Sequence, residues 1–202
     1  DKYNIRVVLD ASLLGENAYL VHLREEEFKD ASLGDIIKIM TDLSDIVYFS
    51  ARKLSSSRGG GICTNDLDIY REMEALVPLF EGYLTYGGIS VREIESMAVG
   101  LYETLDETMI RQSPDFIAYL VDSLVSHNVP MVTPAGVLGA HVNAMKVCEH
   151  IPQNQYPAGA LAAALFLISG VRGMERGTVS NQRDEYGNET LADMELVRLA
   201  VP

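Results

Sequence analysis

The sequence predicts an α/β fold, with a mostly parallel sheet in its first half and a smaller α+β unit after it. Up to residue 88, short apolar segments rich in β-branched residues alternate with helical segments, which is typical of a parallel sheet covered by helices. Beyond residue 128 the apolar segments become shorter and are separated by turns. The chain has 202 residues, of which 48% are hydrophobic and 22% charged, so it can form a substantial core.

The first predicted strand covers residues 5–10 and has Asp10 at its carboxyl end. Its β-branched, apolar composition favours a buried parallel strand over an amphipathic helix. A charged helical pattern follows over residues 16–28. A second helix is predicted over residues 33–43, with Ser32 as its N-cap.

A second strand is predicted over residues 45–50, and the polar, glycine-rich loop after it carries Lys53. That loop leads to a third strand at residues 62–64. Helical periodicity returns over residues 67–80 and breaks at the glycine-containing segment 81–88. Lys53 is therefore expected just past the end of a strand, as Asp10 is at the end of another.

One or two long helices over residues 91–127 are predicted to join two structural units. We place the domain boundary after residue 105, which gives domains of residues 1–105 and 106–202. The second domain is expected to contain a helix over residues 158–169 and a last strand at about residues 196–201, and to be incomplete.

Composition excludes several classes of partner. The net charge of −13 and a pI near 4.6 argue against nucleic acid and anionic membranes, because no run of Lys or Arg forms a basic patch. The longest apolar stretch, residues 158–170, is too short to span a bilayer. Cys63 and Cys148 do not form a disulfide framework, so we expect free thiols and a cytoplasmic location. The histidines lack metal-ligand spacing and are predicted to be surface or packing residues: His22, His127, His141 and His150.

Asp10 and Lys53 are the residue types that a pyridoxal-phosphate enzyme needs at the carboxyl ends of neighbouring strands. The lysine amine forms a Schiff base with the cofactor, and the carboxylate keeps the pyridine nitrogen protonated. The spacing alone leaves two alternatives open. Lys53 could be a solvated surface lysine, and Asp10 a carboxylate of the turn after a strand.

Segments along nearly the whole chain point to a known family. They are residues 7–10, 16–19, 49–53, 81–82, 85–88, 97–101, 149–152, 156–158, 170–172 and 195–199. In this order they resemble the C-terminal half of the tyrosine phenol-lyase and tryptophanase family, pyridoxal-phosphate-dependent β-eliminating lyases. The resemblance implies part of the three-layer fold-type-I sandwich of aspartate-aminotransferase-like enzymes, with part of their small α+β domain.

The resemblance also implies roles for particular residues. Asp10 matches the carboxylate at the pyridine nitrogen, and Ser50 matches a hydroxyl that contacts the phosphate of pyridoxal phosphate. Lys53 matches the Schiff-base lysine, which is also a candidate base at Cα. Arg198 matches the arginine that binds the substrate α-carboxylate, a role suited to a guanidinium fork.

Arg176, in the segment Met174–Gly177, resembles the phenol-lyase branch, because tryptophanases have an apolar residue there. It is expected to bind the phenol leaving group, and a structural ion pair is the alternative. The implied reaction is β-elimination from tyrosine, giving phenol, pyruvate and ammonia.

Four residues differ from the family pattern close to the expected site. Leu13 replaces an arginine near the cofactor, Arg52 a lysine, Leu138 an active-site histidine and Asn143 an aspartate. Two other functions therefore stay open. The chain could be a non-catalytic subunit or drifted paralogue, or it could carry out a different pyridoxal-phosphate reaction such as transamination.

The family's N-terminal half lies outside the resemblance, with the phosphate-binding loop and part of a monovalent-cation (K⁺) site. A parallel sheet that lacks the strands of the N-terminal half would expose apolar edges and faces. We therefore expect a complementary N-terminal-half chain and a homo- or hetero-oligomer.

Overall fold

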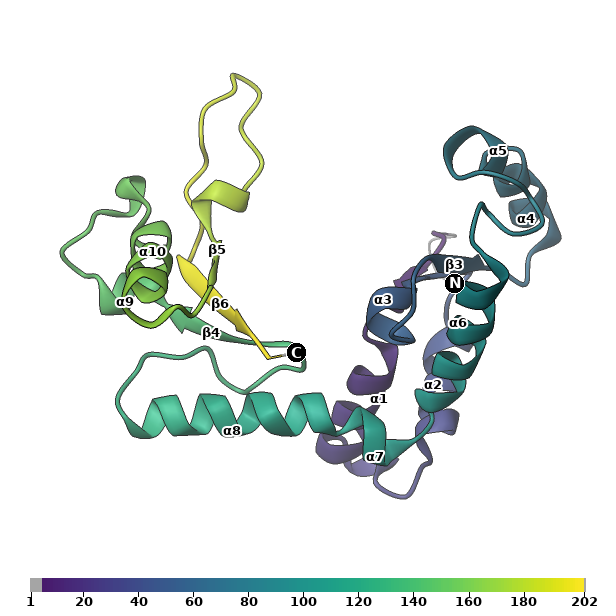
Figure 1. Cartoon of the computed structure of the whole chain (residues 1–202), viewed down its shortest axis with the longest axis horizontal. Coiled ribbons are helices and arrows are strands. Elements are labelled where there is room, and N and C mark those ends of the chain that lie inside the picture. The colour runs from purple at the N-terminus through teal and green to yellow at the C-terminus, as the bar shows by residue number, and fades with distance from the viewer. Residues whose placement is uncertain (1–4, 202) are drawn as a thin grey trace. The chain divides into compact units, whose positions relative to one another are not determined.

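The computed structural model describes residues 5–201, which form two compact units that meet in sequence between Gln112 and Ser113 (Figure 1). The first unit comprises residues up to 112 and the second unit those from 113 onward. The domain boundary predicted after residue 105 lies a little before the boundary between the two units, within the same helical region.

The sheet of the first unit contains β1 (Val8–Asp10), β2 (Ile46–Ser50) and β3 (Gly60–Cys63), in the order β1-β2-β3. β1 and β2 are parallel, whereas β2 and β3 are antiparallel. The segment between β2 and β3 is too short for the crossover that a parallel pair requires. The sheet, expected to be mostly parallel, thus has one pair of each kind.

The described residues of the first unit also form eight helical segments. They are α1 (Leu14–Arg24), η1 (Glu26–Phe28), α2 (Leu33–Asp42), α3 (Ala51–Leu54), α4 (Leu67–Glu74), α5 (Val77–Phe80), α6 (Val91–Glu103) and α7 (Glu107–Ile110). The N-cap prediction is confirmed, because the Ser32 hydroxyl accepts a hydrogen bond from the Asp35 N–H at 3.1 Å. The helix predicted over residues 67–80 is divided into α4 and α5, and Pro78 lies in the first turn of α5, where its missing N–H costs nothing.

One face of this sheet carries the core of the first unit. Leu9, Val47 and Phe49 pack against the buried residues Ala11, Leu14 and Leu54. A second cluster joins α1 to α2 through buried residues: Ala18, Tyr19, Leu33 and Ile36. The sheet is therefore anchored on one side by its own helices.

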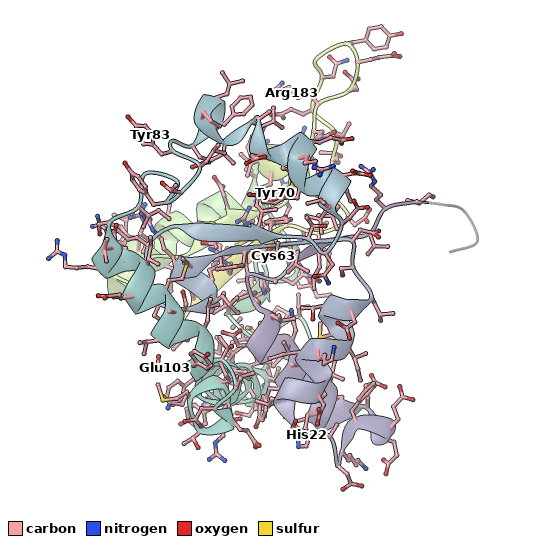
Figure 2. All side chains as sticks on the ribbon, turned by 90° about the vertical axis from the view of Figure 1, so that its right-hand side faces the viewer. His22, Cys63, Tyr70, Tyr83, Glu103 and Arg183 are labelled. Atoms are coloured by element: carbon pink, nitrogen blue, oxygen red, sulfur yellow. The ribbon has the colours of Figure 1, made fainter. Side chains whose placement is uncertain are left out.

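The opposite face of the sheet is open to solvent. It presents Val8, Tyr48 and Ile62, which are 54%, 41% and 64% exposed, together with Asp10. The prediction of a buried first strand is therefore wrong, because β1 is an edge strand and no described residue covers this face. Tyr70 of α4 and Tyr83 after α5 are also exposed (Figure 2).

The second unit has an antiparallel sheet of β4 (Gly139–Asn143), β5 (Met174–Arg176) and β6 (Leu196–Ala200), in the order β4-β6-β5. Its helical segments are α8 (Gln112–Ser126), α9 (Ala144–Val147), η2 (Gln153–Gln155), α10 (Pro157–Ser169) and η3 (Thr178–Ser180). The sheet shares buried clusters with the helices: Val142, Ala144, Ala158 and Val197 in one, Ile117, Val121 and Ala140 in the other. This unit thus has a hydrophobic core of its own. Figure 1 shows the helices and strands that form the unit.

Within residues 5–201, no helix is long and apolar enough to cross a membrane. The two cysteines are free thiols, Cys63 exposed on β3 (Figure 2) and Cys148 buried. The expectation that they form no disulfide is confirmed.

Candidate functional site

Asp10 ends β1 with its carboxylate held by hydrogen bonds. The Ser12 N–H donates to Asp10 Oδ1 at 3.0 Å, and the hydroxyls of Ser12 and Tyr48 also bond to this carboxylate. The Ser12 hydroxyl, the Ser12 N–H and Tyr48, with the charge of Lys53, lower the pKa of Asp10 below its ordinary value. Asp10 is therefore ionised at neutral pH.

Ser12 and Tyr48 were not among the residues predicted from the sequence. Ser12 is buried, and its hydroxyl accepts a hydrogen bond from the Ser50 N–H at 3.2 Å, which ties the ends of β1 and β2 together. Tyr48 lies opposite Asp10 in the register of the two strands, and this hydrogen bond raises its pKa. A serine two residues after a strand-end Asp is a common turn pattern and could have been noticed, whereas Tyr48 required the register.

Lys53 lies in α3, a short helix that begins directly after β2, where a polar loop was predicted. The helix is fastened by buried Ala51, whose N–H donates to the Gly59 carbonyl at 2.9 Å, and by buried Leu54. Lys53 itself is exposed and has no ion pair or hydrogen bond within the described part of the chain. Its amino group is therefore accessible to a ligand.

Ser50 lies between these two groups, at the N-cap of α3. Its hydroxyl makes no hydrogen bond to another described residue. The structure thus brings Asp10, Ser50 and Lys53 to one end of the sheet. A carboxylate that stays ionised, a free hydroxyl and a free amine fit the ring nitrogen, the phosphate and the aldehyde of pyridoxal phosphate, respectively.

Arg176 and Arg198 belong to the second unit, on β5 and β6. Arg198 pairs with Met174 and Arg176 pairs with Leu196, so both arginines lie on the same face of the sheet. The alternate residue Val197 points into the core. Arg198 Nε is buried without a hydrogen-bond partner, and neither arginine forms an ion pair with any of the described residues.

His141 of β4 lies directly opposite Arg198 on this face. It is half-buried, and burial, followed by the charges of Arg198 and Arg176, lowers its pKa, which a backbone hydrogen bond at Gly139 partly offsets. His141 was predicted to be a surface or packing residue. Its position beside Arg198 depends on strand pairing, which the sequence does not display.

The four departures from the family pattern are found in both units. Leu13 immediately precedes α1, and Arg52 is exposed next to Lys53. Leu138 immediately precedes β4, while Asn143 ends it and accepts a hydrogen bond from the Lys146 N–H at 3.3 Å. Asn143 therefore has a structural role as the cap of α9.

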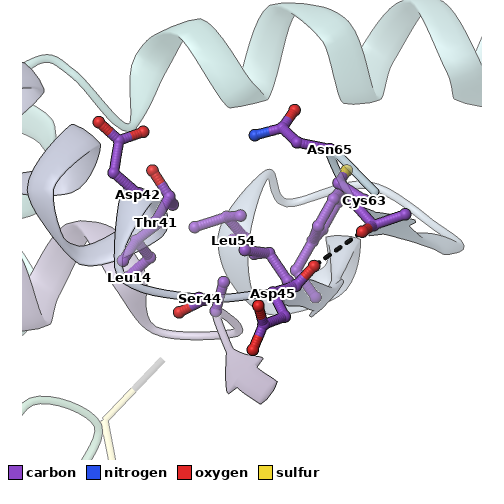
Figure 3. Close-up of a pocket in the computed structure, with 12 residues that line it drawn as sticks. Leu14, Thr41, Asp42, Ser44, Asp45, Leu54, Cys63 and Asn65 are labelled. Atoms are coloured by element: carbon purple, nitrogen blue, oxygen red, sulfur yellow. Dashed lines mark hydrogen bonds between the residues drawn. The ribbon is translucent and has the colours of Figure 1, made fainter. Parts of the chain in front are cut away.

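A pocket of about 260 Å³ opens on the core-side face of the first sheet (Figure 3). It is lined by Ala11, Leu14, Thr41, Asp42, Ser44, Asp45, Val47, Phe49, Leu54, Cys63, Thr64 and Asn65. Because it contains two carboxylates and no Lys or Arg, it does not suit a phosphate-bearing cofactor. Asp10 and Lys53 are not part of it. The described residues also contain no cluster of His, Cys, Asp and Glu that could hold a metal ion.

Known proteins match the chain over its whole length. Tyrosine phenol-lyase of Pasteurella multocida is 42% identical over 203 residues, and a probable tryptophanase of Aeropyrum pernix is 39% identical over 203 residues. Each match covers 100% of this chain and 44% of the relative, so the chain spans less than half the length of these relatives. No family model matches.

Among solved structures, an archaeal O-phosphoseryl-tRNA(Sec) selenium transferase has a TM-score of 0.54 at 12% identity, covering 98% of this chain and 41% of that one. At this identity the likeness concerns the fold alone. It agrees with the expected part of a fold-type-I architecture. With the identities of 39% and 42% along its whole length, the chain belongs to the tyrosine phenol-lyase and tryptophanase family of pyridoxal-phosphate-dependent lyases.

Proposed function

We propose that the chain is the cofactor-bearing part of a lyase that eliminates phenol from tyrosine. The observation that carries this proposal is the arrangement of Asp10 and Lys53 at the ends of neighbouring strands. Asp10 is kept ionised by Ser12 and Tyr48, and the charge of Lys53 acts on it. This is the acid and amine pair that pyridoxal phosphate uses.

Bound pyridoxal phosphate supplies an electron sink for a substrate that loses its Cα proton. Asp10 holds a proton at the ring nitrogen, and Ser12 and Tyr48 orient its carboxylate. Lys53 Nζ would hold the cofactor through its aldehyde carbon and would accept the Cα proton of the substrate. The Ser50 hydroxyl donates to the cofactor phosphate.

The arginines of the second unit bind the substrate in this proposal. Arg198 receives the α-carboxylate through its guanidinium fork, and Arg176 donates to the phenol oxygen, on which negative charge develops as the carbon–carbon bond breaks. The absence of an acidic partner for either arginine among the described residues supports this assignment, since their charges are available to a ligand. Phenol, pyruvate and ammonia are the products.

A complementary chain or an oligomer completes the protein in this proposal. The open face of the first sheet, with Val8, Tyr48 and Ile62 exposed, supports it, because an apolar sheet face of this kind is usually covered. The chain spans 44% of the relatives' length, and the remaining part would supply the rest of the cofactor phosphate site. A K⁺ site stays a prediction.

A non-catalytic subunit is the second candidate. The observation that favours it is the apolar side chain of Leu13, which lies three residues after Asp10 in place of a cation. Leu138 likewise removes a titratable group from the second unit. Cofactor uptake distinguishes the two candidates, because a subunit that has lost its activity need not bind pyridoxal phosphate.

The test combines the chain with the part of the Pasteurella multocida tyrosine phenol-lyase that it does not match. We expect pyridoxal phosphate to give a visible absorbance band that borohydride removes, and we expect Lys53→Ala to abolish it. Arg52→Ala is the matched control and should retain the band. If no cofactor is taken up by the completed protein, the proposed enzyme is wrong and the non-catalytic subunit is favoured.

Phenol release from tyrosine then tests the substrate. Arg176→Ala should lower it roughly 10- to 100-fold, because a hydrogen bond from a charged donor to the leaving group is lost. Unchanged phenol release in this variant would show that Arg176 does not bind the leaving group. Cofactor uptake without phenol release would favour another pyridoxal-phosphate reaction, such as transamination.

A further inference from the structure

His141 and Arg198 are closer neighbours than their register alone indicates. The Ala144 N–H donates to the Glu195 carbonyl at 2.8 Å, so these two residues form a hydrogen-bonded pair of the antiparallel ladder. Hydrogen-bonded and non-hydrogen-bonded pairs alternate along β4 and β6. His141 and Arg198 therefore form a non-hydrogen-bonded pair. The His141 carbonyl instead accepts from the Val132 N–H at the other edge of β4, at 2.9 Å. Side chains approach most closely across such non-hydrogen-bonded pairs.

The charges around His141 are all positive on this face. Arg198 comes from β6 and Arg176 from β5, and both act on the imidazole. Residues 130–133, at the other edge of β4, contain no titratable side chain. Burial and the two guanidinium groups therefore disfavour the protonated imidazole in the ligand-free protein, and this lowers the pKa of His141.

Arg198 has hydrogen-bonding capacity that the described residues do not use. Its Nε is buried and lacks an acceptor, an arrangement that is costly unless a ligand supplies one. A carboxylate bound there would bring a negative charge next to His141. That charge opposes the effect of the two arginines and favours the protonated imidazole.

We propose that His141 is part of the carboxylate site around Arg198 and takes up a proton when an anionic ligand binds there. The inference rests on the proposed role of Arg198. It adds His141 to the residues that bind the carboxylate, and it adds the uptake of one proton to the binding step. The protonated ring gives the ligand a further charged donor beside the guanidinium fork. The ligands expected at this site are arylpropanoates, which bind through their carboxylate group.

Proton uptake makes binding dependent on pH. The pKa of His141 is low in the free protein and higher in the complex, so affinity rises as pH falls between these two values. The largest slope is about tenfold in affinity per pH unit, the limit for one proton taken up. Outside that interval the contribution of His141 to affinity is expected not to change with pH.

The experiment uses the whole chain and para-hydroxyphenylpropanoate, which is tyrosine without its amino group. Nuclear magnetic resonance of isotope-labelled histidines follows each ring through a pH titration, with and without the ligand. We expect the pKa of His141 to rise when the ligand binds, and we expect the ring signals of exposed His150 to be the same with and without the ligand. His141→Gln identifies the resonance and should flatten the pH dependence of affinity, whereas His150→Gln, the matched control, should not.

The outcomes separate this inference from the proposed function. If the ligand binds in an Arg198-dependent manner, shown with Arg198→Gln, but the pKa of His141 does not change, the role of His141 is overturned and that of Arg198 stands. If the wild-type chain does not bind the ligand at any pH, the carboxylate site itself is wrong. Cofactor uptake through Lys53 is measured separately and is unaffected by either result. The change in pKa is itself measured on the wild-type chain, and His141→Gln is needed only to assign the resonance.

Discussion

The sheets of the two units differ in how they are stabilised. In the first unit no described strand residue of β1, β2 or β3 is fully buried, and one sheet face is open. In the second unit Gly139, Ala140, Val142 and Val197 are buried in β4 and β6, beneath residues of helices. The residues proposed to bind the cofactor thus lie on the sheet with one open face, and the two arginines proposed to bind the substrate lie on the sheet of the second unit.

The first sheet depends more on close backbone contacts and helix caps. Gly100 of α6 comes so near to α3 that a Cβ at this position would lie 2.1 Å from the Ser55 carbonyl oxygen. α6 also begins with a capping box formed by Ser90 and Glu93. These features hold the helix that carries Lys53 against the sheet.

The largest expected effect concerns the core of the second unit. Ile117 is 0% exposed, so Ile117→Ala should lower the free energy of unfolding of this unit by about 2–5 kcal/mol through lost burial and a cavity. Val8→Ala, on the open sheet, should change stability by less than about 0.5 kcal/mol. Urea unfolding followed by circular dichroism measures both. Equal effects would show that the two sheets do not differ as described.

A smaller effect is expected at the contact between α6 and α3. Gly100→Ala should destabilise the first unit by about 1–3 kcal/mol, because backbone atoms must move apart. Gly34→Ala in α2 is the control, since its Cβ would meet nothing nearer than 3.8 Å. It should be neutral or stabilising by up to about 1 kcal/mol. Hydrogen exchange of α3 amides would report whether the Lys53 helix loosens in Gly100→Ala alone.

The smallest effect is expected at the cap of α6. Ser90→Ala should cost about 1 kcal/mol, because the Ser90 hydroxyl accepts from the Glu93 N–H. Hydrogen bonds from the Ser90 N–H and hydroxyl lower the pKa of Glu93. This stabilisation is therefore present above the ordinary pKa of Glu and is lost as pH falls through the lowered value.

Acid unfolding curves of the wild type and of Ser90→Ala would measure this dependence on pH. The difference between the two curves should narrow at low pH, where Glu93 is protonated in both proteins and only the hydrogen bond from the Glu93 N–H to the Ser90 hydroxyl still distinguishes them. Ser96→Ala removes only a hydroxyl bonded to the Arg92 carbonyl in the same helix, and serves as the control. A constant difference between the curves at all pH values would contradict the role of Glu93.

The sequence predicted the strand ends well but not their surroundings. Asp10 and Ser50 end strands as expected, since apolar runs stop at polar residues there, and Ser32 caps a helix as expected. These features are local in sequence, so composition and periodicity reveal them. The placement of Asp10 and Lys53 at one end of a sheet followed from the same signals.

The remaining features depend on contacts between distant residues. α3 was missed because a four-residue helix shows no periodicity, and β1 was expected to be buried because burial depends on what covers a strand. The antiparallel pairing of β3 follows from a short connection that composition does not reveal. His141 was assigned to the surface or to packing because only the register with β6 brings it to Arg198.

The surface of α10 has a practical consequence for work with this protein in solution. The helix has no charged residue, and Phe166, Leu167 and Ile168 near its end are 54%, 83% and 87% exposed. Contiguous apolar surface of this kind favours colloidal association as concentration rises, even though the net charge of −13 opposes it elsewhere. The end of α10 is therefore one of the surfaces that favour association at crystallisation or spectroscopic concentrations, together with the open face of the first sheet.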